Sequence, residues 1–208
     1  NMEILKNYYK NNDSLEVGVD EVGRGCLAGP VVAGAVIWDP EIKQERGFYI
    51  RDSKKLSERK RYILKDFIEE YAIDSNVHFV DNVRVDAINI YHASHEAMHK
   101  AIRGLRVEPE LILADGDKFT PYMNNSDNYI EHQCVPGGDD KYCSIAAASI
   151  LAKCERDKWV EDICDKYPEL EENYKWKSNK CYGTVAHMTG IKEYGITEWH
   201  RKSFGPCK

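Results

Sequence analysis

The segment from Val17 to Gly25 constrains this chain most, because it joins an apolar stretch to two adjacent carboxylates and a glycine-rich turn. Asp20 and Glu21 follow the apolar residues directly, and a Gly-Arg-Gly turn comes two residues later. A strand sends consecutive side chains to opposite faces, but a bend at its end would bring both carboxylates to one site. Glycines permit close approach of the backbone to a ligand. The segment predicts a place for a divalent metal and a phosphodiester; the plainer alternative is a strand followed by an ordinary polar turn.

Length and composition predict a globular chain of one domain. The 208 residues contain 42% apolar residues, and no stretch reaches the ~20 apolar residues of a membrane span. The polar start, Asn1-Met2-Glu3, does not resemble a signal peptide. The seven cysteines are scattered and include no CxxC pair, which argues against a disulfide framework or a zinc ribbon. We therefore expect a cytoplasmic protein with free thiols and no contact with a membrane.

Charge is segregated along the chain, although the net charge is −6. Residues 51–61 and residues 175–202 each carry six basic and two acidic residues, whereas residues 160–173 carry six acidic residues and one lysine. Basic segments of this kind can meet a nucleic acid even when the whole chain is acidic. Solvated helix faces are the plainer interpretation for part of each segment.

Hydrophobic periodicity predicts an α/β layer fold with one mixed sheet. The helix expected over 142–166 has an alanine-rich face that can pack closely on a sheet, and Ser57 is the expected N-cap of another helix. Short helices and loops are expected after Pro168, and a surface loop over 124–128. The predicted strands are 15–19, 31–37, 77–80 and 111–114, and the predicted longer helices are 57–72, 86–105 and 142–166.

Four carboxylates stand at points where this fold would gather them. Asp20 and Glu21 end one apolar strand, Asp115 ends another, and Asp139 lies just before the alanine-rich helix. Ligand sites in α/β sheets gather at strand ends. Converging carboxylates repel one another unless divalent cations such as Mg²⁺, which prefer oxygen ligands, neutralise them. Such a pair of cations could serve in-line phosphoryl chemistry.

Four sequence blocks, in order, resemble ribonuclease HII, the type 2 ribonuclease H family. They are Asp20–Gly25 (DEVGRG), Asp52–Ser57 (DSKKLS), Ser144–Lys153 (SIAAASILAK) and Ser203–Pro206 (SFGP). The resemblance covers about residues 15 to 206. It implies a ribonuclease H-like fold, with a mixed five-stranded sheet flanked by helices. It also implies a single domain over residues 1–208, with a helical C-terminal part over about 168–208.

The resemblance implies an endonuclease that uses two divalent ions, Mg²⁺ or Mn²⁺. Its substrates would be RNA–DNA hybrids and DNA duplexes with embedded ribonucleotides, and its products would carry 3′-hydroxyl and 5′-phosphate ends. By motif, Asp20, Glu21, Asp115 and Asp139 become the catalytic and metal-binding acids. The family usually has Lys-Gly-Asp at the last position, where this chain has Gly-Gly-Asp-Asp. Asp140 and Asp117 therefore stay open as alternatives for the fourth acid.

The resemblance also assigns a sensor for the ribose 2′-hydroxyl, which alone distinguishes a ribonucleotide from a deoxynucleotide at a given site. Gly23, Arg24 and Gly25 form the turn that the family uses for this purpose.

Phosphate contacts are expected from Ser53, Lys54 and Lys55, where an ordinary basic turn before a helix is the alternative. Tyr182 resembles the tyrosine that the family stacks on the sugar beyond the junction; without the resemblance it would be a packing residue. The family more often has His-Lys-Gly-Tyr-Pro-Thr around this tyrosine, so Asn179, Cys181 and Gly183 depart from it. Glycine in place of proline should loosen this loop.

Four further residues invite weaker interpretations. His92, His95 and His99 share one helix face, but solvated or packed histidines are a better interpretation than a metal site. Lys153 either reaches the acidic site or pairs with a carboxylate on its own helix.

Two other functions compete with the nuclease: a non-catalytic protein that binds hybrids, and a related enzyme that acts on DNA alone. Four acids favour an enzyme, and a 2′-hydroxyl sensor would serve no purpose on DNA alone. We expect a monomer by analogy, and we find no segment that resembles a sliding-clamp peptide.

Overall fold

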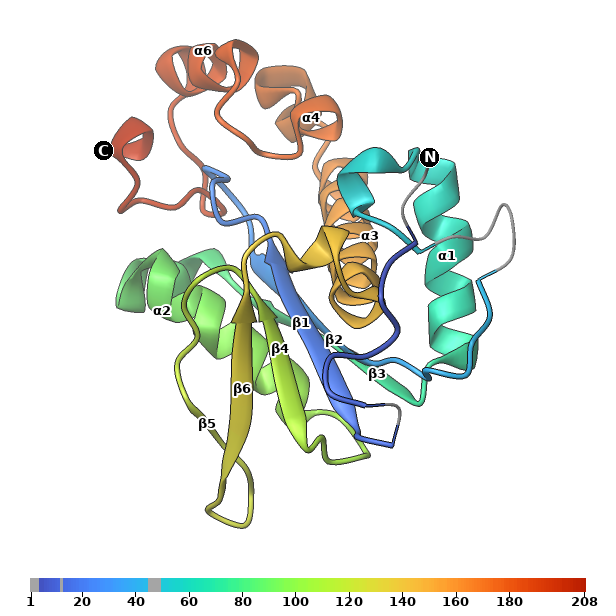
Figure 1. The fold of residues 1–208 in the computed structure, drawn as a ribbon. Helices are drawn as coiled ribbons and strands as arrows, with labels where there is room; N and C mark the ends of the chain where they lie inside the picture. The colour runs from blue at the N-terminus through green and yellow to red at the C-terminus, as the bar shows by residue number, and fades with distance from the viewer. Residues whose placement is uncertain (1–3, 12, 45–49) are drawn as a thin grey trace.

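The computed structural model describes residues 4–11, 13–44 and 50–208, which form a mixed sheet flanked by helices (Figure 1). The strand order is β3-β2-β1-β4-β6-β5. β1 is antiparallel to β2 and parallel to β4, which in turn is parallel to β6. The strands are β1 Glu16–Val22, β2 Val31–Ile37, β3 Asp74–Val80, β4 Leu111–Asp115, β5 Tyr122–Met123 and β6 Tyr129–Val135.

The predicted mixed sheet is confirmed, but it has six strands within the described residues, where five were expected. The sixth is β5, a two-residue strand that pairs antiparallel with β6 at the edge of the sheet. The sequence also predicted an end of the first strand at Val19. β1 instead continues through Asp20 and Glu21 to Val22, because all three pair with β2.

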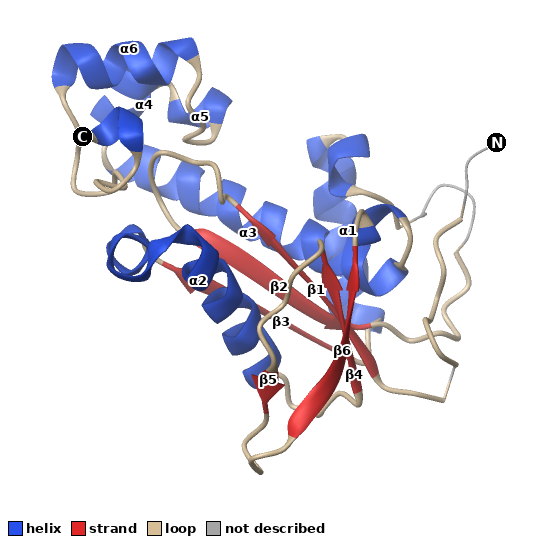
Figure 2. Cartoon of the chain, turned by 60° about the vertical axis from the view of Figure 1, so that its left-hand side comes forward, coloured by secondary structure: helices blue, strands red, loops and turns tan. Residues whose placement is uncertain are grey.

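Helices cover both faces of the sheet (Figure 2). α2 packs on one face, over a core that includes Val17, Val19 and Ile112. α1 and α3 cover the other face, where Val36 meets the alanines of α3. The helices are α1 Glu58–Tyr71, α2 Asn82–Arg103, α3 Cys143–Lys166, α4 Glu169–Tyr174, α5 Trp176–Asn179 and α6 Val185–Tyr194, with short 3₁₀ helices η1 Ser53–Lys55, η2 Gly138–Asp140 and η3 Gly205–Cys207.

α3 lies unusually close to the sheet, as its alanine-rich face predicted. A Cβ atom added at Gly18 would collide with the backbone of Ser144, and one at Gly34 with the carbonyl of Ala148. Only glycine on the strands and small residues on the helix permit this approach. The contact brings the first turn of α3 directly beside β1, the strand that carries Asp20.

The predicted helix boundaries are confirmed for α1 and α3 and corrected for α2. Ser57 caps α1 as expected, since its hydroxyl accepts a hydrogen bond from the Lys60 N–H. α2 begins at Asn82 rather than at Asp86, because Asp81 is its N-cap. The helix is kinked at Asn89, whose φ is 66°.

The C-terminal part, α4 to η3, lies beyond the ends of β1, β4 and β6, toward which these three strands run (Figure 1). Trp176 is fully buried in a cluster that joins this part to α3 and to Cys26 and Ala28 of the loop after β1. All seven cysteines are free, as expected. The described residues include no helix with the length and apolar character needed to cross a bilayer.

Candidate active site

Three elements bring the four predicted acids together. Asp20 and Glu21 lie near the end of β1, and Asp115 is the last residue of the adjacent parallel strand β4, where Val19 is in register with Ala114. Asp139 lies in η2, the short helix just before α3. Asp20 and Asp139 are buried, at 5% and 7% exposure, although both are charged in water at neutral pH.

The carboxylates influence one another strongly. Burial, followed by the charges of Glu21, Asp115 and Asp139, raises the pKa of Asp20 well above its ordinary value. Burial raises the pKa of Glu21 to about 7, with Arg24 opposing the shift and Asp115 adding to it. The pKa of Asp139 is also raised, first by burial and then by Asp115. Without a cation, the site therefore opposes its own full ionisation.

Hydrogen bonds orient two of the acids. The Asp115 Oδ1 accepts from the Gly138 N–H at 2.8 Å, which ties η2 to the end of β4. The Asp20 Oδ1 accepts from the Glu21 N–H at 2.8 Å.

Asp139, rather than Asp140 or Asp117, lies with the other acids. Asp139 is buried, and the pKa of Asp20 is raised partly by its charge. Asp140 is exposed, and its Oδ1 is 2.8 Å from the Nζ of Lys55. Asp117 is also exposed. The geometry therefore favours Asp139 as the fourth acid.

The acid cluster fits divalent cations as an open site. Over the described ranges, no three His, Cys, Asp or Glu side chains form a group that could hold a metal ion by themselves. Mg²⁺ seldom needs such a cage, since it commonly keeps waters and binds one or two carboxylates together with substrate phosphate. Burial and the neighbouring carboxylates raise the pKa of Asp20 and of Asp139, and a bound cation would offset both effects by favouring the charged carboxylates.

The Gly-Arg-Gly turn lies directly beside these acids. Gly23 has a φ of 89°, and an added Cβ atom there would collide with the Arg156 side chain and lie 2.9 Å from the Pro30 carbonyl oxygen. The Arg24 guanidinium is 3.5 Å from Glu21, so the turn also contributes a cation to the edge of the site. Arg24 and Gly25 are exposed, whereas Gly23 is buried, so the open edge of the turn is Arg24–Gly25.

A basic turn faces the acids from η1. The Lys54 side chain is 79% exposed, and its Nζ lies 3.8 Å from the Asp139 Oδ2. The nearby charges of Asp139 and Asp52 raise the pKa of Lys54. Ser53 is buried, and its hydroxyl lies 3.0 Å from the hydroxyl of Ser149. Lys54 and Lys55 are therefore available to a ligand, while Ser53 fits a role in fixing the turn.

Tyr182 lies across from the turn. Its ring is 3.8 Å from the position that a Cβ atom of Gly25 would take, and the residue is 43% exposed. The Asn179 side chain donates to the Tyr174 carbonyl and the Thr184 hydroxyl and accepts from the Cys181 N–H. These bonds oppose the looseness that Gly183 alone would cause.

Comparison with known proteins decides the family. A profile described as Ribonuclease HII matches residues 17–207, nearly the whole chain. The chain belongs to the ribonuclease HII family. The ribonuclease HII of Christiangramia forsetii is 46% identical over 200 residues, which cover 96% of this chain and 94% of that protein. The chain is accordingly an endoribonuclease of the ribonuclease H class, which acts on RNA–DNA hybrids.

Solved structures confirm the predicted ribonuclease H-like fold. The ribonuclease H2 of Pyrococcus horikoshii superposes with a TM-score of 0.75 and 25% identity, covering 92% of this chain and 94% of that one. The ribonuclease HII of Archaeoglobus fulgidus, solved as a PCNA:RNase HII complex, gives a TM-score of 0.71 at 24% identity, covering 91% and 95%.

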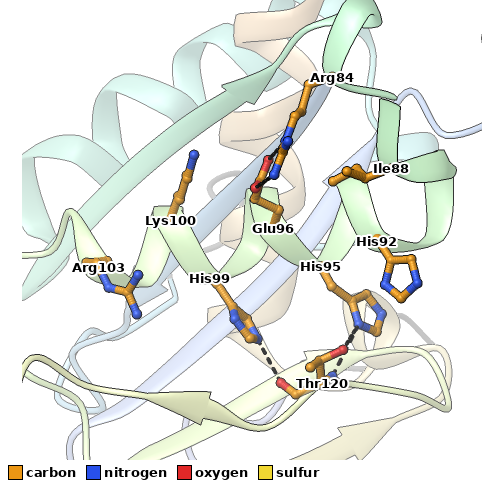
Figure 3. Close-up of a pocket in the computed structure, with 9 residues that line it drawn as sticks. All are labelled: Arg84, Ile88, His92, His95, Glu96, His99, Lys100, Arg103 and Thr120. Carbon is orange, nitrogen blue, oxygen red and sulfur yellow. Dashed lines mark hydrogen bonds and ion pairs between the residues drawn. The ribbon is translucent and has the colours of Figure 1, made fainter. Parts of the chain in front are cut away.

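The three histidines on α2 line a hollow together with Thr120, and none of the four predicted acids lines it (Figure 3). The His95 Nδ1 accepts from the Thr120 N–H at 3.2 Å, and the His99 Nε2 lies 2.7 Å from the Thr120 carbonyl oxygen. These bonds fit packed histidines that fix the segment before β5. Lys153, the other open assignment, pairs with Asp157 on its own helix at 2.9 Å.

The sequence did not predict a second set of residues, which are buried beneath the site and hold its loops by hydrogen bonds. Arg156, Arg201, His187 and His200 are all buried. Arg156 donates to the carbonyls of Ala28, Pro30 and Lys180. For Arg156, the signal in the sequence was an arginine within the small-residue helix α3. Hydrophobic periodicity could not predict its partners, because it gives no information about which carbonyl oxygens lie nearby.

Proposed function

We propose that this ribonuclease HII cleaves the RNA strand of hybrids and also nicks DNA duplexes on the 5′ side of an embedded ribonucleotide. The products would carry 3′-hydroxyl and 5′-phosphate ends, and the activity would serve ribonucleotide removal and the clearance of RNA primers. The observation that supports this most is the acid cluster, with Asp20 and Asp139 buried, beside a Gly-Arg-Gly turn whose residues Arg24 and Gly25 are exposed.

Asp20, Glu21, Asp115 and Asp139 would hold two divalent ions, Mg²⁺ or Mn²⁺. Such ions lower the pKa of water and neutralise charge on the phosphate and the leaving oxygen. A related enzyme of lower similarity, Bst-RNase HIII, has been solved in complex with Mn²⁺. The protein's part is to hold the oxygen ligands in a buried, pre-oriented set: the Gly138 N–H fixes Asp115, and the Glu21 N–H fixes Asp20.

The turn would read the sugar while the basic residues hold the backbone. Arg24 and Gly25 are exposed residues that would face a ribose, and their neighbour Glu21 belongs to the acid cluster. A 2′-hydroxyl bound here would therefore lie next to the phosphate that is cleaved. Lys54 and Lys55 would contact phosphate oxygens, with Ser53 fixing their turn from inside.

Tyr182 would stack on the sugar that follows the ribonucleotide. Its ring lies within van der Waals reach of Gly25, so the turn and the ring would form two adjoining walls of one site. A deoxyribose fits against an aromatic ring more closely than a ribose, because it lacks the 2′-hydroxyl.

Partners and location stay predictions for this chain. We propose a monomer in the cytoplasm, a single domain over residues 1–208 and a C-terminal helical part from about residue 168. The PCNA complex belongs to the Archaeoglobus enzyme. We propose no clamp partner here, because no segment of the sequence resembles a clamp peptide.

A cleavage assay tests the proposal directly. The substrates are a DNA duplex with one embedded ribonucleotide, an RNA–DNA hybrid and an all-DNA duplex, each with Mg²⁺ and then with Mn²⁺. We expect a single nick 5′ of the ribonucleotide and an intact all-DNA control. Hybrid cleavage without the nick would restrict the enzyme to longer RNA tracts, and no cleavage by folded protein would favour a hybrid-binding protein. Equal cutting of the all-DNA duplex would indicate a DNA-directed enzyme.

The identity of the fourth acid gives a separate prediction. Asp139→Asn should lower turnover at least about tenfold, since it removes a buried ligand from the cluster. Asp117→Asn and Asp140→Asn should keep turnover within about threefold, because both carboxylates are exposed and outside the cluster. Steady-state cleavage at saturating Mg²⁺ checks all three variants. A larger loss from Asp140→Asn than from Asp139→Asn would reassign the fourth ligand.

The role of Tyr182 gives another. Tyr182→Ala should reduce cleavage at a single ribonucleotide more than cleavage of a long hybrid, by a factor of about ten, which is within the range of about 1–3 kcal/mol known for the stacking of one base on an aromatic ring. Tyr182→Phe keeps the ring and should behave like the wild type. The ratio of kcat/KM on the two substrates is the measurement, and equal losses on both would argue against stacking.

A further inference from the structure

One buried dipeptide near the C-terminus, His200–Arg201, connects the Gly-Arg-Gly turn with the loop that carries Tyr182. Its backbone runs beside the residues that follow the turn: the Gly29 N–H donates to the Trp199 carbonyl, and the Arg201 N–H donates to the Leu27 carbonyl. The two side chains support different walls of the proposed site: that of Arg201 contacts the Gly-Arg-Gly turn, and that of His200 is linked to Tyr182 through His187.

Arg201 holds the Gly-Arg-Gly wall. It is fully buried, and its guanidinium donates to three carbonyl oxygens: Nη2 to Gly23 at 2.7 Å, Nη1 to Arg24 at 2.9 Å and Nε to Gly29 at 3.0 Å. Among the ion pairs of the described residues, none includes Arg201, so carbonyl dipoles rather than a carboxylate compensate its charge. A planar fork with fixed donors specifies the separation of its acceptors, which a flexible ammonium does not.

His200 holds the tyrosine wall through His187. The Thr197 N–H donates to the His200 Nδ1 at 2.8 Å, so that nitrogen is an acceptor and the His200 proton is on Nε2. The His200 Nε2 lies 2.9 Å from the His187 Nε2, which also accepts from the Trp176 indole N–H. The His187 proton is therefore on Nδ1, and it is donated to the Tyr182 carbonyl at 3.0 Å.

One arrangement of protons, with both histidines neutral, gives each of the four ring nitrogens a partner, and the Trp176 and His200 N–H groups share the single lone pair of the His187 Nε2. Burial lowers the pKa of both histidines, and that of His200 to about 4. The chain of donors starts at the main chain of Thr197 and ends at the main chain of Tyr182. The Tyr182 carbonyl is thereby held by two donors, the His187 Nδ1–H and the Thr184 N–H.

We propose that His200 and Arg201 are positioning residues that set the distance between the Gly-Arg-Gly turn and Tyr182, and thereby the preference for a ribonucleotide–deoxyribonucleotide junction. The proposal rests on the proposed function, since it explains how that function would select its substrate. Arg156 supports the same arrangement, because it links Ala28 and Pro30 to Lys180 just before the tyrosine. Small displacements matter here, since a misplacement of about 1 Å can cost about 100-fold in rate.

Arg201→Lys is the main test, because it keeps the charge and removes the fork. The measured quantity is the preference ratio, defined as kcat/KM on the single-ribonucleotide duplex divided by kcat/KM on the hybrid. We expect the ratio to fall about tenfold or more. Arg84→Lys, which changes an exposed arginine paired with Glu96, should leave the ratio unchanged.

A stability-matched control separates positioning from folding. Val160→Ala removes buried methyl groups from the cluster around Trp176 and should lower Tm without moving the ratio. An Arg201→Lys protein with the same Tm loss and an unchanged ratio would show that Arg201 is structural only, and would overturn the proposal.

The histidine side has its own pair of variants, which also serves if Arg201→Lys does not fold. In His187→Asn, an amide N–H can take the place of the Nδ1–H that Tyr182 accepts. In His187→Leu, nothing can. We expect the ratio to fall about tenfold in the leucine variant and less than threefold in the asparagine variant. Equal ratios in both would overturn the proposal.

Experiment can distinguish a failure of the proposed function from a failure of the positioning role. If the wild-type protein nicks no single-ribonucleotide duplex, the proposed function is wrong. If the wild type nicks it selectively and all variants keep its preference ratio, only the positioning role is wrong.

Discussion

Asp20→Asn is expected to lower turnover by at least about 100-fold while making the metal-free protein more stable at neutral pH. Asparagine keeps the shape of the side chain and one oxygen, so the fold should survive, but the charge that attracts a divalent cation is lost. Asp20 is the acid whose pKa responds to all three of the others, so it is central to the cluster. Removal of one catalytic residue can lower kcat by several orders of magnitude, for example about 10⁴-fold.

The stability change follows from the direction of the pKa shifts. Folding raises the pKa of Glu21 from 4.5 to about 7 and that of Asp20 in the same direction, so the folded state binds these protons more tightly than the unfolded chain. Without metal, the free energy of unfolding is therefore highest below the ordinary carboxyl pKa, where both carboxyl groups are protonated. It decreases as the pH rises toward about 7. Asparagine removes one negative charge from the cluster. It should therefore raise the free energy of unfolding at neutral pH by an amount on the order of 1 kcal/mol.

Thermal unfolding in a chelator checks this at about pH 5 and about pH 8. The variant and the wild type should differ little at the lower pH, and the variant should melt at a higher temperature at the upper pH. Added Mg²⁺ should raise the Tm of the wild type more than that of the variant, because a ligand stabilises the state that binds it. Asp117→Asn is the matched control, and near-normal cleavage by Asp20→Asn would remove Asp20 from the site.

Gly23→Ala is expected to lower cleavage at ribonucleotides at least about tenfold, together with a clear loss of Tm. The φ of 89° at Gly23 costs an alanine about 1–2 kcal/mol. The new methyl group would also collide with the Arg156 side chain, which is fixed by three main-chain carbonyls. The turn must therefore move, and with it the exposed edge that we propose to contact the ribose.

Gly195→Ala is the control for this substitution. Gly195 has a similar φ of 78°, but no atom lies within 4 Å of an added Cβ atom. It should show the conformational cost in Tm with cleavage unchanged. The comparison therefore isolates the collision at Gly23, and equal activity of the two variants would contradict it.

The sequence predicted those parts of the fold that depend on local pattern. Ser57 marked the start of α1, and the apolar run 31–37 is β2 with the predicted bounds. β6, Tyr129–Val135, escaped prediction because a histidine lies among the less exposed positions of its alternating pattern and polar or aromatic residues fill the exposed ones, so the sequence shows no apolar face. α2 was placed too late in the chain because the capping role of Asp81 precedes the apolar periodicity.

The residues of the site likewise include some that local sequence pattern could predict and some that it could not. Acids after apolar runs are visible in sequence, and the structure brings Asp20, Glu21, Asp115 and Asp139 into mutual influence. The resemblance of motifs, rather than physics, singled out Tyr182. The buried supports Arg201 and His187 could not be predicted, since a buried arginine or histidine is specified by distant carbonyls and indole groups that no local pattern encodes.

The parallel pairing of β1 with β4 has a consequence for how the protein is made. Asp20 and Asp115 are neighbours in space but about 95 residues apart in the chain, so their approach requires the closure of a long loop, whose entropy cost is met only by the assembled core. Asp139 and the first turn of α3 come later still. A growing chain on the ribosome therefore carries these carboxylates far apart, and they do not yet form one cluster. Its ability to cut a nucleic acid arises only with cooperative completion of the fold.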